Sequence, residues 1–456
     1  MTSVHLPERL SLKRRILSAS SWSVAGYALN YPIRLASSLL LTRLLVPQMF
    51  GVMAVAMTVM TGLAMFSDLG LTQNIVQSKR GSDPDYLNTV WTIQVLRGLL
   101  LWLIGLCISL FILAADRLGL VPKESAYADA YLPYVICAVS FTMVIGGLRS
   151  TKFSEASRNL SLGRVTQIQL VGQIGGLICI IAWILIDRSI WGLVAGSIFS
   201  TVVGTVLSHT WLPGNTNRWR WDQSAFHEIL HFGKWMFLSS ILGFIANNGD
   251  RLLLGGYVDA TTLGIYSIAY TFSSAIIQIL NSLFSQVSYP ALSEVARERL
   301  PDLKSALYRF HMLTASFTYF CTGALIVSGG PLVRFLYDPR YAQAGWMLEV
   351  LSVGLLCVPS NLPIYCLLAR GLAKNFTGLI AVRAVATVVL IPLGFHYYGF
   401  QGALWGIIAS QLSIVPPTIY YQVKYDLFDI SKELILLPVF LVGMAVAKGV
   451  NLAIGY

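Results

Sequence analysis

Three arginines lie within long apolar stretches of the chain, where a charged side chain is costly and usually has a function. The three cations, each with the polar residue one helical turn away, are Arg34 with Asn30, Arg97 with Gln94, and Arg383 with Thr387. A guanidinium stays charged and binds phosphate through two parallel hydrogen bonds. We therefore expect these side chains to line a membrane cavity for an anionic substrate, such as a diphosphate or an acidic sugar.

Each arginine also has a structural interpretation that the sequence leaves open. Arg34 could form an interhelical ion pair with Asp68 on the next apolar stretch. Arg97 and Arg383 could pair within a helix bundle, or extend toward the membrane surface while their apolar stems stay in lipid.

Further polar residues are candidates for ion coupling or for structural roles. Glu349 lies in an apolar stretch, where its protonation could change with burial and with the approach of an arginine. Asp68 is expected to cap or pair near one membrane surface, and its counterpart in the second half of the chain is Asn281. Asp250 and Arg251 are adjacent opposite charges, for which we expect local pairing and a role in structure or gating.

These residues have to be positioned by membrane helices. Hydrophobic residues make up 55% of the 456 residues and charged residues 12%, about half the charged share of a soluble domain, and the mean hydropathy is +0.67. Thirteen apolar stretches approach the roughly 20 residues of a spanning helix: 18–43, 51–76, 89–114, 131–148, 165–186, 189–211, 233–256, 263–289, 309–329, 343–368, 375–396, 399–422 and 434–454. None shows the alternation of a β-barrel strand, so we predict an all-α polytopic membrane protein. Pro359 and Pro363 should break the stretch 343–368.

The two halves of the chain share a sequence pattern. Residues 39–56 and 252–269 both read L-L-L-x9-G-x4-A, and the offset from Gly51 to Gly264 is 213 residues. This repeat predicts two six-helix lobes related by a pseudo-two-fold axis along the membrane normal. We expect an N-terminal lobe at 1–212, a cytoplasmic interfacial linker helix at 213–232, a C-terminal lobe at 233–424 and an additional transmembrane segment at 425–456, as one or two extra C-terminal helices.

Loop charges predict the orientation, and the cysteines argue against a cofactor. With the N-terminus in the cytoplasm, 21 of the 28 lysines and arginines assigned to loops fall on the cytoplasmic side, as the positive-inside rule requires. All six cysteines lie in apolar stretches without metal-ligand spacing. We expect no metal, no cofactor, no catalytic residues and no nucleic-acid partner.

Four segments, in this order, resemble the polysaccharide transporter branch of the multidrug/oligosaccharidyl-lipid/polysaccharide exporter superfamily. They are L-L-L-T-R-L-L-V-P-Q-M-F-G at 39–51, S-D-L-G-L-T-Q-N-I-V-Q at 67–77, F-H-E-I-L-H-F-G at 226–233, and N-N-G-D-R-L-L-L-G at 247–255 with L-G-I-Y-S-I-A-Y at 263–270 and Y-P-A-L-S at 289–293. The likeness extends from about residue 10 to residue 424.

The resemblance implies a flippase of the bacterial inner membrane rather than an enzyme. Its substrate would be an undecaprenyl-diphosphate-linked oligosaccharide repeat unit for O-antigen, capsule or exopolysaccharide export. The implied mechanism is alternating access between two lobes, coupled to an H⁺ or Na⁺ gradient, with the lipid bilayer and the polysaccharide polymerase machinery as partners.

Two other functions in the same superfamily stay open. A multidrug cation antiporter should have an acid-lined cavity, whereas the cavity candidates here are mostly arginines. A peptidoglycan-precursor flippase is expected to have fourteen spans, one more than this sequence provides.

Overall fold

The computed structural model describes residues 12–159 and 161–454, and its regular structure in that part of the chain is helical. The helices of the first half are α1 (Leu12–Leu44), α2 (Pro47–Phe66), α3 (Leu71–Gln77), α4 (Pro84–Arg117), η1 (Ala126–Ala128), α5 (Leu132–Gly147), α6 (Lys152–Arg158), α7 (Leu162–Ile186) and α8 (Trp191–Thr210). Those of the second half begin with α9 (Gln223–Tyr257), α10 (Ala260–Leu283), η2 (Phe284–Ser288), α11 (Tyr289–Glu298), η3 (Leu300–Asp302), α12 (Leu303–Leu336) and η4 (Pro339–Tyr341). They continue with α13 (Ala344–Val353), η5 (Gly354–Ser360), α14 (Asn361–Ala369), α15 (Ala373–Leu412), α16 (Val415–Lys424), α17 (Ile430–Leu434) and α18 (Leu437–Ile454).

Length and composition identify a polytopic membrane protein. Within the described residues, nine helices are long and apolar enough to cross a membrane, or ten if the bent pair α5 and α6 forms one span. The predicted spans at 18–43 and 233–256, in α1 and α9, are outside that set. Helix α15 is counted once, although Gly399 at φ 58° divides it into two helices. That kink lies between two stretches that the sequence predicts as separate spans.

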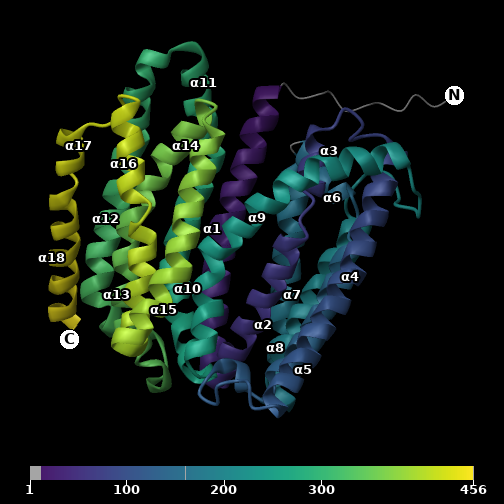
Figure 1. Cartoon of the computed structure of the whole chain (residues 1–456), viewed down its shortest axis with the longest axis horizontal. Helices are drawn as coiled ribbons and strands as arrows, with labels where there is room; N and C mark the ends of the chain where they lie inside the picture. Colours follow the sequence, from purple (N-terminus) through teal and green to yellow (C-terminus); the bar gives the residue numbers. More distant parts are fainter. Residues whose placement is uncertain (1–11, 160, 455–456) are drawn as a thin grey trace.

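The helices gather into two groups that splay apart at one end and meet at the other (Figure 1). One group holds α2 to α8 and the other α10 to α18, with α1 and α9 between them. The splayed end carries α3, α6 and α11, and we call it the strap end; the opposite end carries η1 and η4, and we call it the far end. The groups touch directly where α2 packs on α10, and α9 packs on both α2 and α15.

The connection between the two halves is an extended strap, residues 211–222, that crosses the strap end. Asn217 accepts hydrogen bonds from Ser150 Oγ at 2.7 Å and from the Thr151 amide at 3.1 Å. Asp222 pairs with Arg80 at 2.6 Å and caps the first turn of α9. The Arg80 guanidinium bonded to Asp222 holds the pKa of that carboxyl well below its usual range.

This arrangement differs from the separate interfacial helix that the sequence predicts at 213–232. Residues 213–222 are not helical, and the F-H-E-I-L-H-F stretch belongs to the beginning of the 35-residue helix α9. The Asp222 cap explains where the helix starts, because its side chain accepts the Ser224 amide, one of the first-turn N–H groups with no partner inside the helix.

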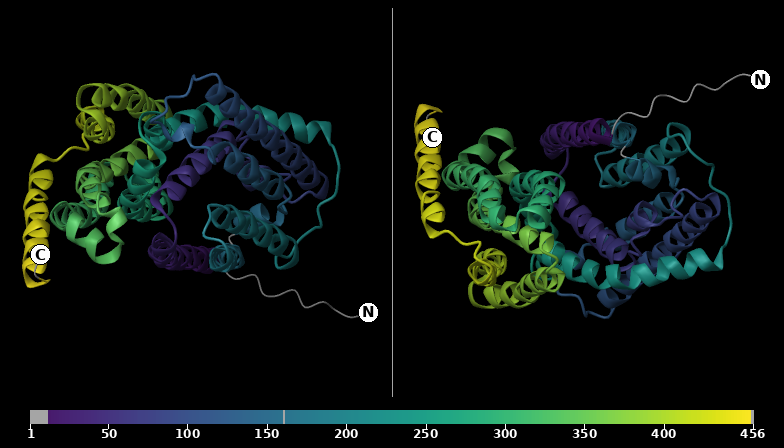
Figure 2. Two further views of the ribbon diagram at one scale, coloured as in Figure 1. Left: turned by 90° about the horizontal axis from the view of Figure 1, so that it is seen from below. Right: turned by 90° about the horizontal axis from the view of Figure 1, so that it is seen from above.

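Helix α18 packs on α12 at the outer edge of the molecule in both views of Figure 2. Gly323 and Gly443 let the two backbones approach, since a β-carbon on either would collide with a backbone atom of the other helix. Pro331 removes a helical N–H donor for the Val327 carbonyl, and Asn451 from α18 donates to that carbonyl at 3.2 Å. The additional segment is therefore bound by a specific polar contact as well as by close packing.

Candidate functional site

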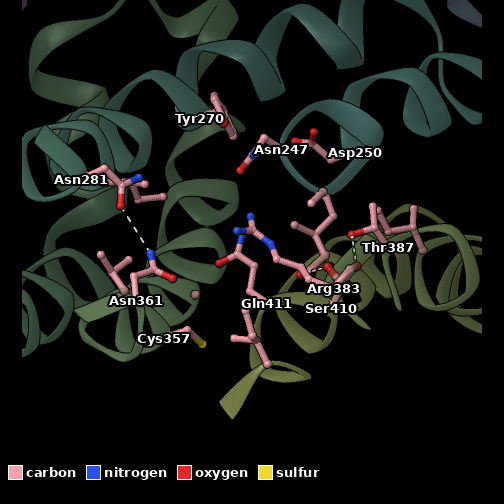
Figure 3. A pocket seen from close by; sticks show the side chains of 17 residues that line it. Asn247, Asp250, Tyr270, Asn281, Cys357, Asn361, Arg383, Thr387, Ser410 and Gln411 are labelled. Atoms are coloured by element: carbon pink, nitrogen blue, oxygen red, sulfur yellow. Dashed lines mark hydrogen bonds between the residues drawn. The ribbon is translucent and has the colours of Figure 1, made fainter. Parts of the chain in front are cut away.

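A pocket of about 80 Å³ lies among α9, α10, η5, α14 and α15. We call it the Arg383 pocket. Figure 3 shows Arg383 reaching into its middle, with Asn247, Asp250 and Tyr270 along one wall and Asn281 with Asn361 along another. The wall at η5 exists because the helix breaks where the sequence predicts it, in the 3₁₀ segment that contains Pro359. Thr387 also lines the pocket, and its hydroxyl donates to the Arg383 carbonyl at 2.9 Å.

Arginines from two helices lie at this pocket, Arg251 from α9 and Arg383 from α15. Arg251 lies over the Tyr270 ring with its guanidinium carbon 4.1 Å from the centroid, a favourable cation–π contact. Arg383 reaches into the same pocket from α15. Neither Arg251 nor Arg383 is in a salt bridge with another described residue. Arg34, an exposed residue of α1, is not among the residues that line the pocket, so its place in the substrate path stays a prediction.

Asp250, a carboxylate that lines the pocket, is already held by a tyrosine. The Tyr266 hydroxyl donates a hydrogen bond to Asp250, and both side chains are buried. Asp250 and Arg251 do not pair with each other, because adjacent residues on a helix point in different directions. The buried Nε atoms of Arg251 and Arg383 have no hydrogen-bond partner among the described residues. The pocket therefore contains charged N–H groups that can donate hydrogen bonds to an anion.

Asn30 and Asn281 have structural partners. Asn30 donates to Gln173 on α7 at 2.9 Å, which links α1 to its neighbour. Asn281 accepts from Asn361 at 3.4 Å across the Arg383 pocket. The first residue is thus part of helix packing, whereas the second contributes to the pocket wall.

Arg97 and Gln94 lie in a different pocket, in the first half of the chain at the strap end. Arg97 donates to the Ala64 carbonyl at 2.6 Å and to Ser67 Oγ at 2.9 Å, at the end of α2. Gln94 donates to three backbone carbonyls at the end of α5, among them Gly147 at 2.9 Å. Both donate to carbonyls in or just after the last turn of a helix, where intrahelical N–H partners run out. We call this second space, of about 570 Å³, the Arg97 pocket.

Asp68 also lines the Arg97 pocket, and it has no salt-bridge partner among the described residues. Its carboxylate accepts the Gly70 amide at 2.8 Å, in a turn where Gly70 has φ 60°. The alternative of an ion pair between Arg34 and Asp68 is therefore wrong for this conformation. Asp68 instead fixes the turn that leads from α2 into α3.

Glu349 closes a contact between α13 and α12. Its Oε1 accepts the Gly330 amide at 2.8 Å, one residue before Pro331. We expect Glu349→Gln to leave transport and its pH dependence unchanged, since a glutamine carbonyl oxygen can accept the same bond. Glu349→Ala should lower the free energy of unfolding by about 1–3 kcal/mol by removing this hydrogen bond between α13 and α12, measured by thermal unfolding in detergent. A shift of the transport pH profile in Glu349→Gln would instead restore the coupling role.

The two halves meet near the far end through a contact that follows the internal repeat. A β-carbon on Gly51 would collide with the Ala260 carbonyl oxygen, and one on Gly264 would collide with the Pro47 carbonyl oxygen. Pro47 and Ala260 are separated by the same 213 residues as the two glycines. Each half therefore presents a glycine to the same backbone position of the other half.

Two tyrosines add to this closure. Tyr127, in η1, donates to the Leu252 carbonyl of α9 at 2.8 Å. Tyr341, in η4, donates to the Leu45 carbonyl between α1 and α2 at 3.2 Å. Each tyrosine follows the third long helix of its half and reaches the first helical hairpin of the other. We call Gly51, Gly264, Tyr127 and Tyr341 the clasp.

Several of these residues were not predicted. Tyr270 and Gln411 line the Arg383 pocket, and Arg149 lines the Arg97 pocket. A signal for Tyr270 was present, since Tyr266 and Tyr270 lie one helical turn apart in the L-G-I-Y-S-I-A-Y segment. Arg149 lies between two predicted apolar stretches, where a cation is typical of an ordinary loop and gives no sign of a pocket.

Comparison with known proteins gives consistent matches. A family model described as "Polysaccharide biosynthesis protein" matches residues 40–346. The chain is 21% identical to the lipopolysaccharide biosynthesis protein WzxC of Escherichia coli (strain K12), over 95% of this chain and 86% of that protein. It is 22% identical to the succinoglycan biosynthesis transport protein ExoT of Rhizobium meliloti (strain 1021), over 82% of this chain and 73% of that protein. Its fold is similar to the inward-facing conformation of a multidrug resistance MATE family transporter of the MOP superfamily, with a TM-score of 0.63 at 16% identity, covering 86% of this chain and 94% of that chain.

Proposed function

Because this chain belongs to the family of polysaccharide biosynthesis proteins, which are membrane transporters rather than enzymes, we propose that it is a lipid-linked oligosaccharide flippase. Its substrate is an undecaprenyl-diphosphate-linked repeat unit, moved across the bacterial inner membrane for O-antigen, capsule or exopolysaccharide export. The observation that carries this proposal is the pair of arginines at the Arg383 pocket, Arg251 over the Tyr270 ring and Arg383 in the middle, neither with a salt bridge among the described residues. A diphosphate supplies the negative charge that such a site lacks.

The mechanism is alternating access between two six-helix lobes, 1–212 and 233–424, joined at 213–232 and followed by the segment 425–456. Residues 1–11, 160 and 455–456 of these lobes and segments lie outside the described residues. The clasp supports this mechanism, because its contacts join the two halves near the far end, while the helix groups splay apart at the strap end. Opening the clasp and closing the strap end would expose the arginines to the other side of the membrane.

We propose further that the N-terminus and the strap end face the cytoplasm. Cysteines introduced by Lys123→Cys and Asp338→Cys at the far end should then react with a membrane-impermeant maleimide in intact cells. Lys79→Cys at the strap end should react only after permeabilisation, with the native cysteines replaced in all three variants. Labelling of position 79 alone in intact cells would reverse the orientation.

The cationic pocket also bears on the two alternative functions. A multidrug cation antiporter would place positive ligands beside Arg251 and Arg383, which have no salt-bridge partner among the described residues, and like-charge repulsion opposes this. A peptidoglycan-precursor flippase would also carry a diphosphate, so the pocket does not separate it from the proposed function.

Deletion of the gene followed by analysis of lipid extracts tests the proposal in the cell. We expect undecaprenyl-linked oligosaccharide to accumulate and surface polymer to be lost. Unchanged polymer with new sensitivity to cationic drugs would support the antiporter, and lysis with accumulated peptidoglycan precursor would support the cell-wall flippase.

A further inference from the structure

The Arg97 pocket is larger than the Arg383 pocket and lies at the strap end, beneath α3 and α6. We propose that it is a second anion site, which binds the phosphate group of the substrate headgroup before the substrate reaches the central arginines. This inference rests on the proposed function, because it assumes that a phosphate-bearing lipid approaches from this end.

The charges in the pocket favour an anion. Arg97 and Arg149 supply two cations and Asp68 one anion, and neither arginine is in a salt bridge with another described residue. The Arg149 guanidinium lies 5.0 Å from the centre of the Phe153 ring, and its buried Nε has no hydrogen-bond partner in the described part of the chain. Stacking of this kind fixes the plane of a guanidinium while leaving its edge available for a planar pair of hydrogen bonds to phosphate.

Arg97 is held by the protein on one side only. Its Nε and Nη2 donate to Ser67 and Ala64, and a guanidinium has five N–H donors in total. The remaining donors have no hydrogen-bond partner among the residues that the structure describes. Arg97 is therefore a firmly positioned cation with further capacity to bind, which is how a preorganised anion site differs from a flexible surface charge.

The second half of the chain indicates that this polar space is not required by the fold. By order in the chain, α10, α11, α12, η5 and α14 correspond to the elements that line the Arg97 pocket. Between those elements the structure has a buried apolar cluster, which includes Leu280, Phe284, Leu292, Leu307, Leu355 and Leu362. The same architecture thus packs as an ordinary core in one half and as an arginine-lined pocket in the other.

Helices α3 and α6 cover the pocket at the strap end. A single hydrogen bond of 3.1 Å joins Thr72 to Ser154, and both residues line the pocket. Arg158, at the end of α6, donates to the carbonyls of Ile75 and Ser78 at 2.6 Å each and so keeps α3 and α6 together. The pocket is therefore formed within one half of the chain, and it can bind before the two halves move.

The test is to count and rank phosphate sites by native mass spectrometry of the full-length protein in detergent, with undecaprenyl diphosphate as the probe. We expect two bound molecules for the wild type and for Lys79→Gln, a control that removes an exposed cation from the same end. Arg149→Gln should lose one of them, with binding at this site about tenfold or more weaker, and Arg149→Lys should be intermediate because it keeps the charge but not the planar donor pair. Arg383→Gln should also lose one, and the double variant both.

A parallel titration with inorganic pyrophosphate identifies the source of the phosphate. Arg149-dependent binding of pyrophosphate would assign the site to the phosphate alone, and binding of the lipid only would assign it to a membrane-embedded headgroup; both support the proposal. Equal binding of both probes by the wild type and by Arg149→Gln would overturn it. If the wild type and Arg149→Gln move lipid-linked oligosaccharide across vesicle membranes equally well, the second-site proposal is wrong while the proposed function stands. If the wild type moves no lipid-linked oligosaccharide, the proposed function itself is contradicted.

Discussion

Arg383→Gln should abolish export of surface polysaccharide while the protein remains in the membrane at its normal level. Arg383 reaches into the middle of the pocket, and neither a salt bridge nor a partner for its Nε is present among the described residues. Loss of one member of a buried charged pair costs about 2–5 kcal/mol, which is at least about a 30-fold loss of affinity for a diphosphate. Surface polymer and membrane protein level are measured in the same cells.

Three matched variants separate the site from general effects of charge. Arg188→Gln removes an exposed cation and should export normally. Arg34→Ala removes the cation of α1 that the sequence predicts to face the substrate path, and it should also lose export. Arg383→Lys should be impaired, because a lysine binds phosphate as a point charge without the planar pair of donors. Normal export by Arg383→Gln would remove the pocket from the transport path.

Gly51→Ala should shift the protein away from the conformation that is closed at the far end. The added β-carbon collides with the Ala260 carbonyl, which is backbone and cannot rotate aside. Overpacking of this kind costs about 1–3 kcal/mol, which changes the ratio of two conformations by about 5- to 150-fold. Spin labels at positions 123 and 343, on the two halves at the far end, should report a longer distance by electron paramagnetic resonance.

The internal repeat provides a second variant and the chain provides a control. Gly264→Ala collides with the Pro47 carbonyl and should produce the same shift. Gly378→Ala should have no effect, because no atom lies within 4 Å of a β-carbon at that position. The same label distance in Gly51→Ala and in the wild type would mean that the clasp does not control the conformation.

The fold could be predicted as far as local composition determines it. Apolar stretches of spanning length predict helices in lipid. The predicted break between the stretches 375–396 and 399–422 agrees with the kink at Gly399, which divides α15 into two helices. The continuous helix α9 could not be predicted in this way. Asp222, which caps α9, and the first turns of this helix contact the first half at the strap end. Such long-range contacts leave no periodic signal in the sequence.

The site shows the same division between local and long-range information. Arg34, Arg97 and Arg383 look alike in the sequence, each a cation in an apolar stretch with a polar neighbour one turn away. The structure separates them, because Arg97 and Gln94 lie beside the ends of α2 and α5 and satisfy their last carbonyls. For Arg383, the buried Nε has no such partner among the described residues. Whether a polar residue lies beside the end of another helix depends on packing between distant segments. The sequence therefore could not distinguish the three arginines.

The most direct measurement is transport by the purified protein in sealed vesicles that contain undecaprenyl-diphosphate-linked oligosaccharide labelled with a fluorescent group. The fraction of substrate in the outer leaflet is followed by quenching with a membrane-impermeant reductant. We predict that the wild type equilibrates the substrate between leaflets and that Arg383→Gln leaves it in the leaflet where it began. Equal, slow movement with the wild type, with Arg383→Gln and with empty vesicles would contradict the proposed function.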